Sequence, residues 1–448
     1  MSAETLQDSP THLSEPRRRW RNRPHKSVGG GQVIAVADQG IVSAVNFLTT
    51  VLVGRSGGPG QLGVYSLGFS ILLLVLSVLD ALVTGPYIIR LHQLRTRLAQ
   101  YTGSTILHTG CLGAIATAAM LIAGYVWARL SPTNTLPGVL LPTAAIVTPV
   151  LFRELARRLA FVDGRPVIAL ALDSGVALMQ SVGLIIAAHL GALTSTMALT
   201  ASGLACACCS WIFFAGRLKK LEFIPGDALQ DFVDNARIGK WLLASQCAMT
   251  AQFTSVQWLA AIALGTAQTG ELSACMSVVM VVNPFLTGIG NLLLPRASFV
   301  FASEGPRALS RVLNIATATI LAGTTVFVAC MAAFGPRVLG LMYGSRYTQS
   351  HQILLILAFG IALRGTGMAA YLGLWVTGRA RTNFLTNLLG LGTTIAVSLL
   401  GVGEFGLAAV AYGMLAGEAC AATARWIVLK KSLSAHPQRL GALSFGSA

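Results

Sequence analysis

The chain has 448 residues, of which 54% are hydrophobic and only 11% are charged, and its mean hydropathy is +0.68. A soluble domain carries about 25% charged residues, so this composition excludes an ordinary soluble protein and indicates a membrane protein. The net charge of +16 would suggest nucleic-acid binding in a soluble protein, but most basic residues here lie in loops beside the membrane, and no nucleic-acid partner is expected.

Apolar segments of roughly 20 residues, the length that crosses a bilayer as a helix, recur along the chain. Their apolar runs are continuous and do not alternate, which predicts helices and excludes a β-barrel. We therefore predict an all-α polytopic membrane protein with about 12 transmembrane helices. The expected spans are 33–53, 62–84, 101–127, 136–152, 166–188, 195–215, 240–264, 271–294, 309–333, 351–373, 384–402 and 407–429.

Residues 1–32 form a basic tail, and the apolar run after them lacks a cleavage site, so we expect a retained first span. The tail, the loops on its side and the C-terminal end together hold 27 of the 32 Lys and Arg residues, whereas the opposite loops hold only four. Basic loops stay inside, so both termini are expected in the cytoplasm of a multi-pass protein of the cytoplasmic (inner) membrane.

A polar stripe runs along one face of the first span and contains Gln39, Ser43, Asn46 and Thr50. The positions are spaced i, i+4, i+7 and i+11, which places them on one helix face. A similar stripe occurs 207 residues later. Its members are Gln246, Thr250 and Gln257, with Phe253 in the place of Asn46. We predict that the two stripes line a polar cleft between two halves of the chain; simple helix packing is the alternative.

Two further matches support a repeat. The turn at 61–66 (QLGVYS) matches 268–273 (QTGELS), and the segment 161–165 (FVDGR) matches 375–379 (WVTGR). Both copies of the second pair lie on the same side, which predicts two six-helix bundles related by an axis along the membrane normal, a parallel repeat. The expected parts are a basic cytoplasmic tail (1–32), a first bundle (33–215), a cytoplasmic linker (216–239), a second bundle (240–430) and a cytoplasmic tail (431–448).

Arg364 lies near the middle of the tenth span, where a charge is costly and usually faces a bundle interior or a water-filled cavity. One hypothesis is that its guanidinium binds a substrate pyrophosphate. The other is an ion pair with Glu418 in the twelfth span. The two can coexist if substrate and Glu418 compete for the same arginine.

Three further acids, Asp38, Asp80 and Asp173, lie near the cytoplasmic ends of spans. They are candidates for ion coupling or proton relay, with anchoring beside the cytoplasmic arginines as the favoured alternative. Pro284 lies inside the eighth span and removes a backbone hydrogen bond, which predicts a kink that serves either as a hinge or as a static bend.

The cysteines at 206, 208 and 209 have no second pair and no nearby histidine, so they predict packing between helices and no metal site. The sequence has no Walker motif, its loops are short, and no catalytic constellation is visible. We therefore expect no cofactor and no enzymatic activity.

Several short motifs occur in order along the whole chain. They are Gln39 to Phe47 followed by Gly63 to Tyr65, Arg153 to Arg158 before Gly164, Leu293 to Arg296, Gly335 and Pro336 followed by Tyr343 to Tyr347, and Gly406 to Ala409. With twelve spans, the chain resembles the polysaccharide-transporter branch of the multidrug/oligosaccharidyl-lipid/polysaccharide (MOP) exporter superfamily.

This resemblance implies a flippase that moves a lipid-linked oligosaccharide, linked through undecaprenyl pyrophosphate, by alternating access for surface or exopolysaccharide biosynthesis. The implied partners are the lipid-linked glycan, membrane lipids and the polysaccharide biosynthesis machinery. A cation-coupled multidrug exporter of the same superfamily is the alternative, although Arg364 would repel organic cations. A membrane-embedded glycosyltransferase, polymerase or ligase is a third hypothesis, which the short external loops disfavour.

Overall fold

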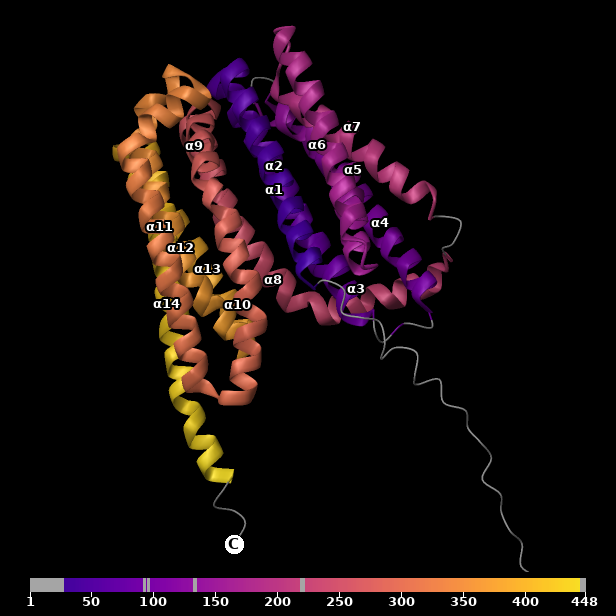
Figure 1. Ribbon diagram of the computed structural model, residues 1–448. Helices are drawn as coiled ribbons and strands as arrows, with labels where there is room; N and C mark the ends of the chain where they lie inside the picture. Colours follow the sequence, from indigo (N-terminus) through magenta and orange to yellow (C-terminus); the bar gives the residue numbers. More distant parts are fainter. Residues whose placement is uncertain (1–27, 92–93, 95–96, 132–134, 218–221, 444–448) are drawn as a thin grey trace, which may run out of the picture.

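The computed structural model describes residues 28–91, 94, 97–131, 135–217 and 222–443, and these residues form two helical lobes (Figure 1). The helices of the first lobe are α1 (Val28–Leu52), the π-helical turn η1 (Val53–Gly57), α2 (Gly58–Leu79), the π-helical turn η2 (Asp80–Thr84), α3 (Gly85–Arg90), α4 (Leu98–Leu130), α5 (Leu136–Val162), α6 (Pro166–His189) and α7 (Ser195–Ala215).

The second lobe follows without an intervening domain. Its helices are α8 (Pro225–Leu264), α9 (Thr266–Val279), the 3₁₀ turn η5 (Met280–Val282), α10 (Asn283–Glu304), α11 (Pro306–Tyr343), the 3₁₀ turn η6 (Ser345–Ser350), α12 (His351–Val376), α13 (Ala380–Phe405) and α14 (Leu407–Leu443). The start of α1 and the end of α14 lie toward the same end of the molecule, which we call the termini end (Figure 1).

Eleven helical stretches in the described part of the chain are long and apolar enough to cross a membrane. The first of them, Val33–Arg90, contains both α1 and α2. These two helices are antiparallel, because Asp38 near the start of α1 and Asp80 at the end of α2 bind the adjacent arginines Arg157 and Arg158. The predicted all-α fold with two bundles is confirmed, and the count of about 12 spans is reached when this stretch is read as two crossings.

The predicted boundaries of the linker and tails differ from the helices. Residues 1–27, 218–221 and 444–448 of these segments lie outside the described residues. The predicted linker (216–239) and second bundle (240–430) are not separated, because α8 runs unbroken through residue 239. Likewise α14 continues past residue 430 into the predicted tail. Polar residues at these ends misled the prediction, since a helix that docks on another lobe or leaves the membrane need not be apolar.

Two turns of the predicted repeat have the same backbone conformation in both halves. Gly58 and Gly265, 207 residues apart, have φ of +76° and +93° with ψ of 179° and 174°, and each ends one helix and begins the next. Gly164 and Gly378, 214 residues apart, have φ of +70° and +73° between α5 and α6 and between α12 and α13. Glycine adopts positive φ at little cost, so equal turns at equal offsets explain the matched motifs.

The two lobes meet along α2 and α9, at the end of the molecule opposite the termini end, which we call the closed end. Tyr347 donates a hydrogen bond to the carbonyl of Gly54 (3.1 Å), and Arg55 donates one to the carbonyl of Leu341 (2.9 Å). A side chain at Gly63 would overlap the backbone of Thr266, so the helices touch where only glycine fits.

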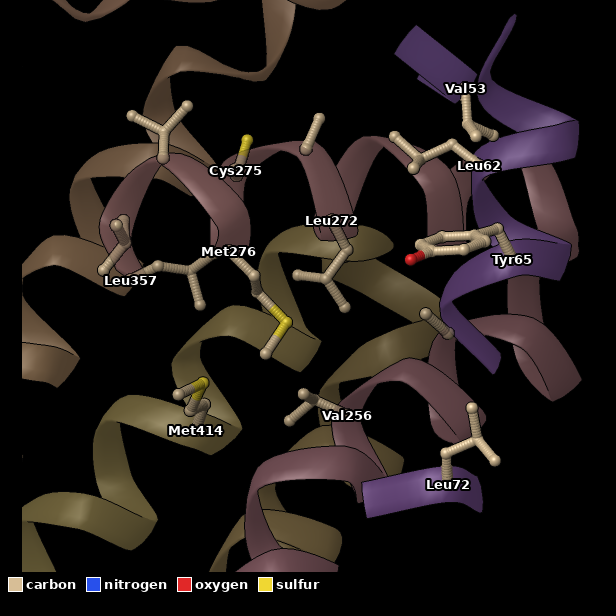
Figure 2. Close-up of a cluster of buried hydrophobic side chains, with 14 of the residues drawn as sticks. Val53, Leu62, Tyr65, Leu72, Val256, Leu272, Cys275, Met276, Leu357 and Met414 are labelled. Atoms are coloured by element: carbon tan, nitrogen blue, oxygen red, sulfur yellow. The ribbon is translucent and has the colours of Figure 1, made fainter. Parts of the chain in front are cut away.

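A hydrophobic core continues across this contact (Figure 2). Leu62 and Tyr65 of α2 are buried beside Leu272 and Met276 of α9, with Val256 of α8 beneath them. At the centre of the contact, Ser273 donates a hydrogen bond to Ser66 (2.8 Å), its own equivalent in the repeat. The approximate two-fold axis that relates the lobes therefore passes between these two serines.

Candidate functional site

A cleft of about 360 Å³ lies between the lobes and takes residues from both. Its first-lobe wall comes from α2, η2 and α5, and its second-lobe wall from α8, η5, α10 and α12. The lining residues are Leu73, Leu76, Ser77, Asp80, Glu154, Arg158, Gln246, Met249, Thr250, Phe253, Met280, Asn283 and Arg364. Its size is that of a small-molecule site, and both charges and apolar surface are present.

Three sequence-predicted residues, Arg364, Gln246 and Thr250, line the second-lobe wall. The guanidinium of Arg364 lies 5.3 Å from the centre of the Phe253 ring, a cation–π contact that holds the cation over an apolar surface. Gln246 and Thr250 reach across the cleft. Gln246 donates to Asp80 (3.4 Å), and the hydroxyl of Thr250 lies 2.7 Å from that of Ser77.

The first-lobe wall carries a compact set of opposite charges on α5 and η2. Arg158 binds Glu154 at 2.9 Å and Asp80 at 3.2 Å, so this one guanidinium connects both carboxylates of the cleft. Thr84 donates a further hydrogen bond to Asp80 (2.9 Å). Glu154 also binds Arg157 at 3.0 Å, so each carboxylate that faces the cleft has an arginine partner.

The predicted coupling acids Asp38 and Asp173 lie behind this wall and are buried. Arg153 binds Asp173 at 2.6 Å, and Arg157 binds Asp38 at 3.1 Å and Glu154 at 3.0 Å. Buried carboxylates are tolerated when they are paired, so this network holds α1, α5 and α6 together. The geometry is that of anchoring beside arginines, and a role in ion coupling stays a prediction.

The predicted partner Glu418 lies on α14 and is buried. The charges of Arg364 and Arg425 both act on its carboxylate. Among the described residues neither arginine approaches it within the 4.0 Å of an ion pair. Arg425 instead donates to Asn387 (2.5 Å), whose amide binds the carbonyl of Ser245 (3.1 Å). In this conformation Arg364 is therefore not engaged by a close carboxylate.

The first polar stripe is placed away from the cleft. Gln39, Ser43, Asn46 and Thr50 are half-buried on α1, and none of them lines the cleft. The core-facing side of α1 lies next to this stripe and carries Thr49, which accepts a hydrogen bond from Gln180 of α6 (2.8 Å). The first-lobe wall is thus built by α2 and α5, because α1 packs mainly on α6.

The second stripe divides between two environments. Gln246 and Thr250 line the cleft, whereas Gln257, three turns from Gln246 toward the closed end, is buried and donates to Ser273 (3.4 Å).

Pro284 is the second residue of α10, which follows the 3₁₀ turn η5 directly, and its neighbour Asn283 lines the cleft. The helix is therefore interrupted at the predicted position, beside the site, and the hinge role stays a prediction.

Sequence reasoning missed Glu154 and Arg158, because the fourth span was drawn to end at residue 152, whereas α5 continues to Val162. The spacing of Glu154 to Arg157 and Arg158, i to i+3 and i+4, was the available signal, since such pairs share one helix face. Among the described residues no group of three His, Cys, Asp or Glu has the arrangement of a metal site.

No protein-family model matches this sequence, and a search of curated proteins finds no match. Solved structures are similar over almost the whole chain. An inward-facing multidrug resistance MATE family transporter of the MOP superfamily has a TM-score of 0.75 at 16% identity, covering 92% of this chain and 100% of that chain. An outward-facing structure of such a transporter has a TM-score of 0.64 at 15% identity, with 91% and 95% covered.

The chain has the fold of MATE transporters of the MOP superfamily. A third similar structure, a MOP superfamily transporter from Pyrococcus furiosus, has a TM-score of 0.65 at 15% identity, with 90% of this chain and 94% of that chain covered. Reversed polarity of its binding pocket is described as suggesting a different function for that protein. At these identities the similarity establishes the fold, and the substrate follows from the site alone.

Proposed function

We propose that the protein is a flippase that moves a lipid-linked oligosaccharide, linked through a pyrophosphate, across the cytoplasmic membrane. The observation that carries the proposal is the charge balance of the cleft. Asp80 is paired with Arg158, and Glu154 is paired with Arg157 as well as Arg158, whereas Arg364 has no carboxylate within 4.0 Å among the described residues. The guanidinium of Arg364 is thus the charged group of the cleft that is available to a ligand, and a guanidinium suits a phosphate.

The transport cycle follows from the two lobes. The lobes touch at the closed end, while the cleft lies on the side of the termini end, where Asp80 and Arg158 are found. With both termini in the cytoplasm, as the distribution of Lys and Arg indicates, this arrangement is the cytoplasm-facing state. The higher TM-score against the inward-facing MATE structure supports the same assignment.

In this state the headgroup enters the cleft and its pyrophosphate binds Arg364, while sugar hydroxyls bind Gln246 and Thr250 and the lipid tail stays in the membrane. Rocking of one lobe against the other then exposes the headgroup on the far side. The polar cleft removes the cost of carrying a hydrated headgroup through hydrocarbon. No bond is made or broken, so the protein acts without catalysis or cofactor, in the service of polysaccharide biosynthesis.

A cation-coupled multidrug exporter is the second candidate, because the similar structures named above include multidrug resistance transporters. In that case an organic cation would bind the ring of Phe253 and the carboxylates of Asp80 and Glu154. It would have to displace Arg158 from those carboxylates and would meet the positive charge of Arg364.

The deciding experiment reconstitutes the purified chain in liposomes and measures both substrates. We expect flipping of a pyrophosphate-linked lipid oligosaccharide, loss of at least tenfold in rate for Arg364→Ala, and partial recovery for Arg364→Lys, which keeps the charge without the bidentate geometry. Arg337→Ala, at an exposed site of α11, is the matched control. Transport of organic cations without flipping of the lipid-linked glycan would establish the exporter instead.

A further inference from the structure

The first turns of α8, residues 225–239, run across the first lobe at the termini end, whereas the remainder of α8 runs along the second lobe (Figure 1). We call these residues the crossing segment. A membrane span needs about 20 residues, and residues 240–264 already supply it. The crossing segment is therefore additional helix, lying at the level where the spans end.

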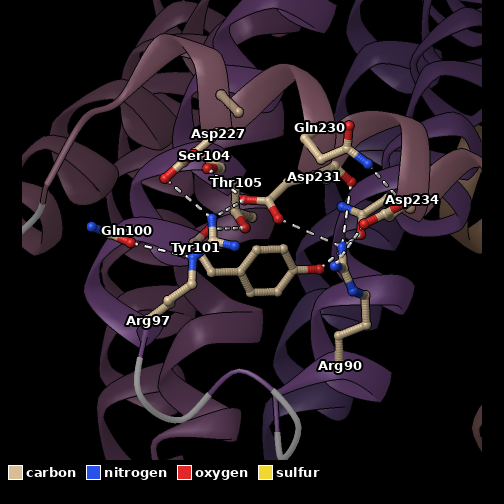
Figure 3. A network of polar contacts seen from close by, with 12 residues as sticks. Arg90, Arg97, Gln100, Tyr101, Ser104, Thr105, Asp227, Gln230, Asp231 and Asp234 are labelled. Carbon is tan, nitrogen blue, oxygen red and sulfur yellow. Dashed lines mark hydrogen bonds and ion pairs between the residues drawn. The ribbon is translucent and has the colours of Figure 1, made fainter.

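The inner face of the crossing segment is polar. Asp231 and Asn235, one turn apart, are buried against α3 and α4. Asn235 accepts hydrogen bonds from Tyr101 (2.8 Å) and Arg90 (2.9 Å). Asp231 accepts one from Ser104 (2.9 Å), and both of these residues are labelled in Figure 3. Hydrogen bonds to buried charged groups are the strong ones, so this face holds the helix on the first lobe.

All three acids of the crossing segment are paired with arginines of the first lobe. Arg90 binds Asp231 at 3.7 Å and Asp234 at 3.1 Å, and Arg97 binds Asp227 at 3.3 Å (Figure 3). The basic residues point outward instead. The side chain of Arg237 is 76% exposed, and Lys240 at the end of the segment is exposed as well. Arg237 also lies 3.9 Å from the carboxylate of Asp234, so the outward surface carries this weakly paired cation and Lys240.

An apolar stripe lies on the flank between these two faces. Leu229, Phe232, Val233 and Ala236 are spaced i, i+3, i+4 and i+7, the pattern of an amphipathic helix that buries one side. Yet Leu229 is 69% exposed, Phe232 39% and Val233 37%. Only one edge of the stripe has protein cover: the ring of Phe232 lies 5.4 Å from that of His108 on α4, whereas Leu229 and Val233 stay exposed although their polar neighbours are buried.

Large apolar side chains continue the exposed surface at both ends of the segment. Phe223 and Ile224 precede it, and Trp241 follows at the point where α8 turns into its span. Tryptophan is enriched at the boundary between hydrocarbon and headgroups, and basic residues beside it bind anionic lipids. The surface therefore combines the three features of a helix that lies in the membrane interface: an apolar flank, an aromatic anchor and outward cations.

We propose that residues 225–241 form an interfacial membrane helix, with the apolar stripe in the acyl-chain boundary and Arg237 and Lys240 among anionic lipid headgroups. The occupant of the stripe is the bilayer itself, because the helix continues directly into a transmembrane span. Its polar face is fixed to the first lobe, so the helix ties that lobe to the plane of the membrane, while the same helix continues into the second lobe.

The test places a fluorescent label on either side of the helix. In a full-length chain whose eight native cysteines are replaced, Val233→Cys puts an environment-sensitive nitrobenzoxadiazole label on the stripe, and Gln230→Cys puts it on the exposed polar flank. Both proteins are reconstituted in phosphatidylcholine vesicles. We expect blue-shifted emission and quenching by nitroxide lipids at position 233, and red-shifted emission and quenching by aqueous iodide at position 230.

Iodide quenching at both positions would overturn the proposal, because the stripe would then face water. Protection of position 233 from both quenchers would also overturn it, since a second copy of the chain would then cover the stripe.

Adding phosphatidylglycerol tests the headgroup contact. The blue shift at position 233 should increase in the native background and stay unchanged when Arg237→Gln and Lys240→Gln are combined. An equal response of both proteins to anionic lipid would remove the two cations from the proposal.

Discussion

Gly54 lies where the first lobe meets the second at the closed end, and its replacement by alanine tests whether this contact holds the observed state. A Cβ at this position would lie 2.7 Å from Cδ1 of Tyr343 and 3.0 Å from Leu62 Cδ2. The tyrosine ring cannot move away freely, because it is buried, its hydroxyl lies 2.5 Å from that of Ser277, and Tyr347 packs beside it. The added methyl group therefore acts on the distance between the lobes.

The size of the effect follows from these distances. Ordinary van der Waals contact begins at 3.4 Å, so Gly54→Ala requires a separation of at least 0.7 Å between the methyl group and the Tyr343 ring. Overpacking of a tight contact costs about 1–3 kcal/mol. We assume that this cost applies only to the observed state, in which the lobes touch at the closed end. The equilibrium then shifts by about 5- to 150-fold toward the state in which the lobes separate there.

Electron spin resonance measures the shift directly. Spin labels on cysteines at Thr196 and Arg337, which are exposed near the closed end on different lobes, report the distance between the lobes. We expect Gly54→Ala to increase the population with the longer distance. Gly60→Ala is the matched control, because a Cβ there meets nothing within 4 Å. Equal distance distributions for both variants would refute the argument that this contact determines the state.

Two further predictions concern buried polar contacts. Asp231→Ala removes the partner of Arg90 and Ser104 and should lower the free energy of unfolding by about 3 kcal/mol in a denaturant titration. Asp234→Ala, at a more exposed position, should lower it by less than about 1 kcal/mol. Similar losses for the two variants would contradict the docking of α8 through Asp231. Ser66→Ala and Ser273→Ala, alone and combined, should show a coupling energy of about 1 kcal/mol, and purely additive losses would mean that their hydrogen bond does not form.

Much of the fold could be predicted because the bilayer restricts a chain to long apolar helices. The turns were predictable for a different reason. Gly58 and Gly265 each occupy a positive-φ position that other residues adopt only with strain, so the repeat leaves a mark in the sequence. The predicted linker is largely helical and continues directly into the following span. Its polar residues face another lobe, and no local pattern reports a contact such as that of Arg90 with Asn235, 145 residues away.

The site was predicted unevenly. Arg364 was identifiable because a charge inside an apolar span needs a polar environment, and it does lie in the cleft. The stripe of α1 does not line this cleft, because spacing establishes which residues share a face and not which neighbour that face meets. A role for this stripe in substrate binding stays a prediction. Glu154 and Arg158 escaped because a polar helix end looks like a loop in a hydropathy reading, although α5 continues through it.

The hydrogen bond between Ser66 and Ser273 has a consequence for how this molecule tolerates change. Contacts on a two-fold axis are isologous, which means that each residue meets its own counterpart. Here the counterparts are joined in one chain, so a substitution in one half faces the original residue in the other. Gly63 and Gly270 limit which substitutions one half can accept, because a side chain on either would overlap the backbone of the opposite half. A larger residue at one of these positions cannot be compensated by a smaller one at the other, since glycine has no side chain to remove.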